Sequence, residues 1–175
     1  MLIEPVSFHL LKGGHDKKSW HMAQQVASGC IRHVEAGRMT RAADVYMGFW
    51  IGALKWRFAP RRFRASVIRT VGKVADEFRG IYAHSTDHDE YRTINCPVTL
   101  IRGMRTQRPA KAVIDILAEL LPSASVIDVP GAGHMSPFSH PDTIRGLCLS
   151  HLWFQKGDRS LQENVNLRDS VSRVA

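Results

Sequence analysis

The feature that most constrains the fold is an alternation of strand and helix in the second half of the chain. A short apolar run, Pro97–Ile101, ends at Gly103, and a second run covers Ser125–Val129. Between them Pro109 opens an amphipathic helix that ends at Pro122. A further helix is expected over about residues 142–154. Strands joined through a helix almost always pair in parallel. The pattern therefore predicts an α/β fold with a short parallel sheet covered by helices.

The first half of the chain is expected to contain one strand and then three helices. Leu2–Phe8 is short and apolar, which is typical of a strand. Ser19 is predicted to cap a helix that ends near Ala36, and Thr40 to cap a second helix. Pro60 suits the first turn of a third, over Arg61–Tyr82. The polar stretch His84–Thr93 is predicted to be a loop.

The excess of positive charge raises the question of a nucleic-acid partner. The chain carries 24 Lys and Arg against 16 Asp and Glu, a net charge of +8, and basic proteins often bind nucleic acid. Five arginines fall within residues 57–69, interleaved with apolar positions, which is typical of a solvated helix face. No nucleic-acid-binding signature accompanies them. We therefore expect no nucleic-acid partner, and binding through residues 57–79 is a minor alternative.

The apolar runs and the cysteines bear on compartment and membrane association. No apolar run reaches the roughly 18 residues that a membrane span needs, and the N-terminal residues lack the pattern of a signal peptide. The sequence therefore predicts no membrane partner. Cys30, Cys96 and Cys148 show no CxxC spacing, which argues against a disulfide framework and a zinc site. A reducing, cytoplasmic setting is expected, with residues 155–175 as a polar tail.

One histidine occupies a position suited to chemistry. His134 directly follows the segment Pro130-Gly131-Ala132-Gly133, just beyond the second predicted strand. Open α/β sheets place their working groups at the carboxyl ends of their strands, and the glycines permit a tight backbone beside the imidazole. Such an imidazole can accept a proton from a nucleophile and return it to a leaving group. The plainer interpretation is an ordinary loop histidine. The other histidines show no metal-ligand spacing.

The stretch from Cys96 to Pro141 resembles the C-terminal end of the α/β-hydrolase superfamily, whose last strand is typically followed by Gly-x-Gly-His. The matching residues are Pro97, Gly103, Leu121, Pro122, Gly131, Gly133, His134, Met135, Pro137, His140 and Pro141. The resemblance covers about residues 2–154. It implies an incomplete α/β-hydrolase fold, with residues 2–8 as the sixth strand, residues 9–93 as a helical cap insertion and residues 94–154 as the closing strand–helix repeats.

The resemblance implies a catalytic role for His134 as the base and a carboxylate that orients it. The commonest place for that acid in the family follows Gly103, but residues 104–106 are Met, Arg and Thr. Some members carry the acid at the end of the sixth strand, and Glu4 resembles that position. Asp115 and Asp128 are weaker alternatives. Glu4 acting only in a loop cap or a surface ion pair is the competing interpretation.

The nucleophile that the family needs has no counterpart in this sequence. No Ser, Cys or Asp has glycines two residues to either side, as the nucleophile elbow requires. The resemblance therefore implies a complementing N-terminal half or a homo-oligomer as partner, a small apolar carbonyl substrate such as an ester, and no cofactor. Trp50, Trp56, Phe58 and Met135 are the expected substrate-binding residues, although core packing explains the cap aromatics equally well. The alternative function is an inactive hydrolase-like module that binds a partner or ligand.

Overall fold

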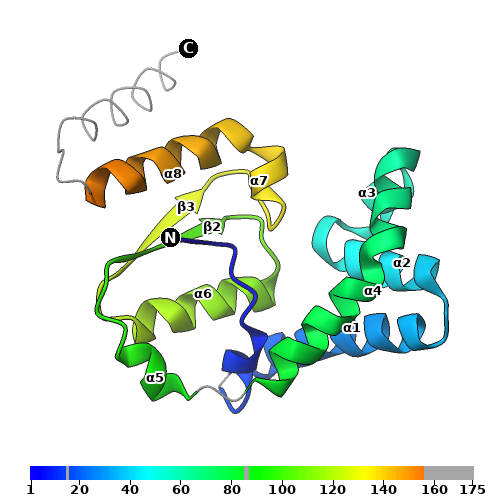
Figure 1. Ribbon diagram of the computed structural model, residues 1–175, viewed down its shortest axis with the longest axis horizontal. Coiled ribbons are helices and arrows are strands. Elements are labelled where there is room, and N and C mark those ends of the chain that lie inside the picture. Colours follow the sequence, from blue (N-terminus) through cyan, green and yellow to red (C-terminus); the bar gives the residue numbers. More distant parts are fainter. Residues whose placement is uncertain (15, 85–86, 156–175) are drawn as a thin grey trace. The chain divides into compact units, whose positions relative to one another are not determined.

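The computed structural model describes residues 1–14, 16–84 and 87–155 (Figure 1). The strands are β1 (Leu2–Ile3), β2 (Val98–Gly103) and β3 (Ala124–Val129), and a short 3-10 helix, η1 (Phe8–Leu11), follows β1. The α-helices are α1 (Lys17–Glu35), α2 (Met39–Ile51), α3 (Ala53–Arg57), α4 (Arg61–Ala83), α5 (His88–Arg92), α6 (Arg108–Leu120), α7 (Ser136–Ser139) and α8 (Pro141–Gln155). The polar tail was predicted over residues 155–175, and from residue 156 onward it lies outside the described residues.

The three strands form one parallel sheet in the order β1-β2-β3. The predicted α/β class with a parallel sheet is therefore confirmed. Six residues of β2 pair with six of β3, whereas β1 contributes only Leu2 and Ile3. Helix α6 packs against β2 and β3, and its inner face includes the buried Val113 and Leu117.

The chain divides into two compact units, and the site and the sheet belong to the larger one, Leu2–Met135. The smaller unit contains Met1 and the segment from Ser136 onward, with helices α7 and α8. Within it, the Cys148 thiol donates to Met1 Sδ at 3.7 Å. No helix among the described residues is both long and apolar enough to cross a membrane.

The first strand is much shorter than the sequence predicts. We expected a strand over Leu2–Phe8, but it ends at Ile3 and the chain turns into η1. The backbone at Glu4 adopts a left-handed φ of 49°, and Pro5 follows it, so an extended ladder cannot continue. The apolar residues of η1 are buried instead: Phe8, Leu10 and Leu11 are at most 2% exposed and pack among α1, α4 and α6.

Two predicted helix caps are wrong. Helix α1 is capped by Asp16, whose carboxylate accepts the Ser19 backbone N–H at 3.1 Å and the Ser19 hydroxyl at 2.6 Å. A carboxylate that accepts from the third helical residue is a preferred cap, and it places Ser19 inside the helix. Thr40 likewise lies inside α2, whose N-cap residue is Arg38. Within the predicted loop His84–Thr93, Asp87 and Glu90 form a capping box that begins α5.

Candidate functional site

Glu4 and His134 come together at the carboxyl ends of the parallel strands. Glu4 directly follows β1, and its backbone N–H donates to the Ile101 carbonyl of β2 at 2.9 Å. His134 lies in the loop after β3. The Nδ1 atom of His134 is 3.4 Å from Glu4 Oε2. The two residues are 130 positions apart in the sequence, so only the sheet topology brings them together.

The Glu4 carboxylate is buried and satisfied by hydrogen bonds. Glu4 is only 3% exposed. Oε1 accepts the Gly103 backbone N–H at 2.5 Å, and Oε2 accepts the hydroxyl of Thr106. A buried carboxylate is tolerated when donors such as these replace water. Thr106 was not expected in the site, because residues 104–106 carry no acid and the donor role of Thr106 depends on an acid that comes from β1.

The loop that carries His134 approaches the end of β2 very closely. The Arg105 backbone N–H donates to the Ala132 carbonyl at 2.8 Å. A Cβ atom on Gly103 would lie 2.5 Å from that same carbonyl oxygen, well inside van der Waals contact. Gly131 adopts a φ of 73°, a conformation that L side chains rarely adopt. The glycines at 103 and 131 therefore allow the loop to reach the Glu4 carboxylate.

The indole of Trp50 stacks on the imidazole of His134. The ring centroids are 3.5 Å apart, and the planes differ by 19°. The His134 side chain is 18% exposed, and Nε2 has no hydrogen-bond partner among the described residues. With Glu4 accepting a hydrogen bond from Nδ1–H, the imidazole is held in the tautomer whose Nε2 lone pair is free to act as a base.

The space beside the pair is small. A cavity of 50 Å³ is lined by His134 and Trp50 together with Tyr46, Phe8 and other core residues. This volume holds a water molecule or two rather than an ester. A larger concavity, of 410 Å³, lies elsewhere and is lined by His9, His84 and Ile81 among others.

The remaining predicted site residues lie apart from the pair. Trp56 is buried and donates its indole N–H to Asp44 at 2.9 Å, and Phe58 is 76% exposed. Neither of them lines the cavity that contains His134. Met135 is half-buried next to His134 in the chain. Of the expected substrate-binding aromatics, the structure therefore places only Trp50 at the pair.

The two alternative acids, Asp115 and Asp128, bind Arg102 and not His134. Arg102 of β2 donates to Asp128 at 2.6 Å and to Asp115 at 2.5 Å. The hydrogen bond from Arg102 lowers the pKa of Asp128, and the same bond raises the pKa of Arg102. This network joins β2, β3 and α6. Glu4 is therefore the carboxylate in contact with His134, while Asp115 and Asp128 stabilise the packing of α6.

His9 heads a second cluster of titratable side chains. Its Nε2 atom is 3.0 Å from the Tyr91 hydroxyl, and its ring contacts His84 with a centroid distance of 4.7 Å. Burial lowers the pKa of His9, and the nearby His84 and His88 lower it further. No group of three or more His, Cys, Asp or Glu residues within the described ranges is arranged to hold a metal ion.

No family model matches this sequence, and no curated protein matches it either. The support for a function therefore comes from the geometry of the Glu4–His134 pair.

Proposed function

We propose that the chain forms part of an α/β-hydrolase-type enzyme that cleaves a small ester-like carbonyl substrate, with the nucleophile supplied from outside the described residues. The observation that supports this most directly is the 3.4 Å contact between His134 Nδ1 and a buried Glu4 carboxylate at the carboxyl rim of a parallel sheet. An imidazole oriented by a buried carboxylate, with its second nitrogen free, is the arrangement that nucleophilic acyl transfer requires.

In the proposed reaction, Nε2 of His134 accepts the proton of the nucleophile as its oxygen or sulfur attacks the carbonyl carbon. The imidazolium then returns this proton to the leaving alkoxide, and an acyl-enzyme remains. In the second half, a water molecule gives a proton to Nε2 and attacks the acyl group. The nucleophile regains that proton as the acid departs. Glu4 stabilises the imidazolium in both halves, and Gly103 and Thr106 hold its carboxylate in place by donating to it.

The nucleophile is the part of this reaction for which the described residues offer no candidate. His134 makes its one hydrogen bond in the described ranges to Glu4, so no hydroxyl or thiol there is paired with Nε2. The cavity beside the imidazole is also too small for an ester. The substrate would therefore bind between His134 and the chain that carries the nucleophile.

The test is hydrolysis of p-nitrophenyl butyrate by the protein isolated in the form that cells make, with any polypeptide that copurifies. We expect turnover that falls by about a thousandfold or more in His134→Ala. Glu4→Gln is expected to lower kcat with little change in KM, because the carboxylate acts through the imidazole. His140→Ala is the matched control and is expected to keep full activity. Equal activity in His134→Ala and the unchanged protein would overturn the proposal.

A hydrolase-like module without catalysis is the second candidate, and the Trp50 stack favours it. The indole covers one face of the imidazole, and the cavity has room only for water. In that case the isolated protein shows no turnover of any ester, and a copurifying partner binds His134→Ala as tightly as it binds the unchanged chain.

A further inference from the structure

The segment from α3 to the middle of α4 is strongly basic. Residues 53–75 contain seven Lys and Arg and no Asp or Glu: Lys55, Arg57, Arg61, Arg62, Arg64, Arg69 and Lys73. All of them are exposed except Arg64, which is half-buried. The ion pairs of the described residues leave six of them without an acidic partner, namely Lys55, Arg57, Arg61, Arg62, Arg64 and Arg69. This charge is therefore available to an outside partner.

Two large apolar side chains are exposed in the same segment. Leu54 is 71% exposed and Phe58 is 76% exposed. They are four residues apart on one helical turn, and the Phe58 backbone N–H donates to the Leu54 carbonyl at 3.2 Å. Residues at this spacing project from the same face of a helix. A single exposed apolar side chain needs no explanation, but an adjacent pair surrounded by unpaired cations does.

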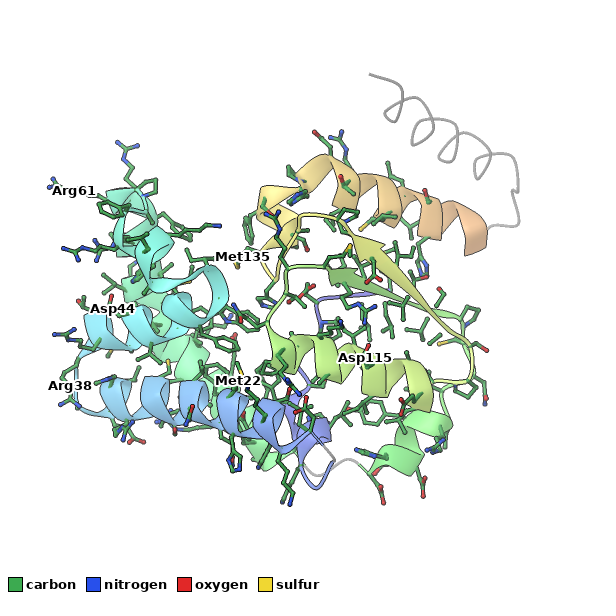
Figure 2. The ribbon with its side chains drawn as sticks, turned by 180° about the vertical axis from the view of Figure 1, so that it is seen from behind. Met22, Arg38, Asp44, Arg61, Asp115 and Met135 are labelled. Carbon is green, nitrogen blue, oxygen red and sulfur yellow. The ribbon has the colours of Figure 1, made fainter. Side chains whose placement is uncertain are left out.

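Internal contacts hold this segment in place. Trp56 lies between Leu54 and Phe58 in sequence, is 3% exposed, and donates to Asp44 of α2 at 2.9 Å. The Arg64 guanidinium lies 5.4 Å from the centre of the Trp56 ring. Because Trp56 faces the interior, Leu54 and Phe58, which lie on either side of it in the sequence, face solvent. We call residues 53–64 the α3–α4 tip. Figure 2 shows Arg61 at the end of the helical region farthest from Asp115 on α6.

We propose that the α3–α4 tip docks on an anionic lipid surface, with Leu54 and Phe58 entering the interface and the surrounding cations contacting phosphate and carboxylate headgroups. Aliphatic and aromatic side chains next to clustered Lys and Arg are the features that interfacial binding uses. A nucleic acid would use the same cations, but it offers no apolar phase for Leu54. The expectation of no membrane partner depended on the lack of an apolar run long enough to span a bilayer, and surface docking needs no such run. The inference is independent of the hydrolase proposal.

The experiment is cosedimentation of the full chain with phosphatidylcholine vesicles, with and without about 30% phosphatidylserine. We expect binding to the anionic vesicles only, weakening as salt is raised above about 0.1 M. Leu54→Ala with Phe58→Ala is expected to weaken binding at least about tenfold. Arg57→Gln with Arg61→Gln and Arg62→Gln is expected to do the same, since each cation near an anionic surface contributes about fivefold.

Matched controls separate the tip from total charge and total apolar surface. Lys12→Gln with Lys17→Gln and Lys18→Gln removes the same charge elsewhere and is expected to weaken binding by less than about threefold. Leu149→Ala with Leu152→Ala removes two other exposed apolar side chains and is expected to bind normally. Circular dichroism checks that every variant is folded.

Four results would overturn the proposal. In the first, the chain binds neither kind of vesicle. In the second, the tip variants and the control variants bind anionic vesicles equally well. In the third, the chain binds an oligonucleotide in a way that needs the tip arginines while vesicles are ignored, which assigns the surface to nucleic acid. In the fourth, the Leu54 and Phe58 variant changes the oligomeric state without any vesicle binding, which assigns the surface to a second copy of the chain.

Discussion

The backbone around Glu4 shows how individual residues carry the candidate site. Glu4 combines a left-handed φ of 49° with a side chain that is almost fully buried. A non-glycine residue in this conformation costs about 1 kcal/mol or more and persists only where its surroundings fix it. Here its N–H donates to Ile101, and its carboxylate accepts from Gly103 and Thr106. The strain is therefore concentrated at the residue that contacts His134.

Gly103 is the residue whose replacement tests the close approach of the His134 loop. In Gly103→Ala, the new Cβ would lie 2.5 Å from the Ala132 carbonyl oxygen, and both partners are backbone, so neither moves easily. We expect a loss of about 1–3 kcal/mol in the free energy of unfolding, measured by urea denaturation. Gly72→Ala is the control, because Gly72 lies within helix α4 and a Cβ atom there would meet nothing within 4 Å. It is expected to stabilise the chain by up to about 1 kcal/mol. Equal stability of the two variants would contradict the loop geometry.

At the scale of elements, η1 joins the helices to the sheet. Phe8, Leu10 and Leu11 leave the end of β1 and pack against α1, α4 and α6. Leu10→Ala removes a side chain that is 1% exposed and leaves a cavity at this junction. We expect it to cost about 2–5 kcal/mol in the free energy of unfolding. Leu149→Ala, on an exposed position, is expected to change stability by less than about 0.5 kcal/mol. A small effect at Leu10 would mean that η1 does not join these elements in solution.

The N-cap of α1 gives a prediction that depends on pH. Hydrogen bonds from Ser19 and Arg108 lower the pKa of Asp16 from 3.8 to about 2. Because the folded pKa lies below the unfolded one, the contribution of this carboxylate is complete above about pH 4 and is lost as the pH falls towards 2. Asp16→Asn keeps a good cap without the charge. We expect the unchanged chain to be more stable than Asp16→Asn at pH 6, with the difference vanishing near pH 2 in urea titrations. A difference that is constant with pH would contradict the assigned role of the charge.

The elements with regular periodicity were predictable, and the short ones were not. The long helices and the strands β2 and β3 follow clear apolar patterns, and proline marks the start of α4 and lies in the first turn of α6. Helices α3, α5 and α7 span one turn or so, which is too short for a periodic pattern to emerge. The strand expected over Leu2–Phe8 has an apolar pattern that η1 buries equally well, so the pattern alone did not distinguish the two.

The candidate site was predictable in part for a related reason. His134 and Glu4 each follow a strand, and strand ends in a parallel sheet meet at one edge. The chain position of His134 therefore indicated that it lies at that edge. Glu4 was placed there only by the family resemblance, because the strand predicted over Leu2–Phe8 runs through it. Thr106 and Trp50 reach the pair through a turn and through helix packing. The contact of Thr106 leaves no spacing in the sequence, so no pattern marked that residue. Trp50 was expected as a substrate-binding aromatic, but no pattern distinguished it from Trp56 and Phe58, which do not line the cavity that contains His134.

At the scale of the whole molecule, the positive charge is unevenly distributed along the chain. The net charge is +8, and seven of the 24 basic residues fall within residues 53–75, where there is no acidic residue. Like charges in a compact state repel each other and lower its stability relative to the unfolded chain. The ion pairs of Arg102 with Asp115 and Asp128 act in the opposite sense. Their short distances make them less sensitive to salt than repulsion between well-separated surface cations.

Salt should therefore stabilise this protein. Raising sodium chloride from about 0.02 M to about 0.2 M shortens the screening length from roughly 20 Å to below 10 Å, which weakens repulsion between surface cations. We expect the melting temperature to rise by about 2–4 °C, the change that about 1 kcal/mol produces in a chain of this size. Arg61→Gln with Arg62→Gln is expected to be more stable than the unchanged chain at low salt and to respond less to added salt. A melting temperature that falls with salt would show that attractive ion pairs outweigh repulsion. In that case, repulsion among the unpaired cations of the α3–α4 tip would not destabilise the folded chain, and binding to an anionic lipid surface would have no such repulsion to reduce.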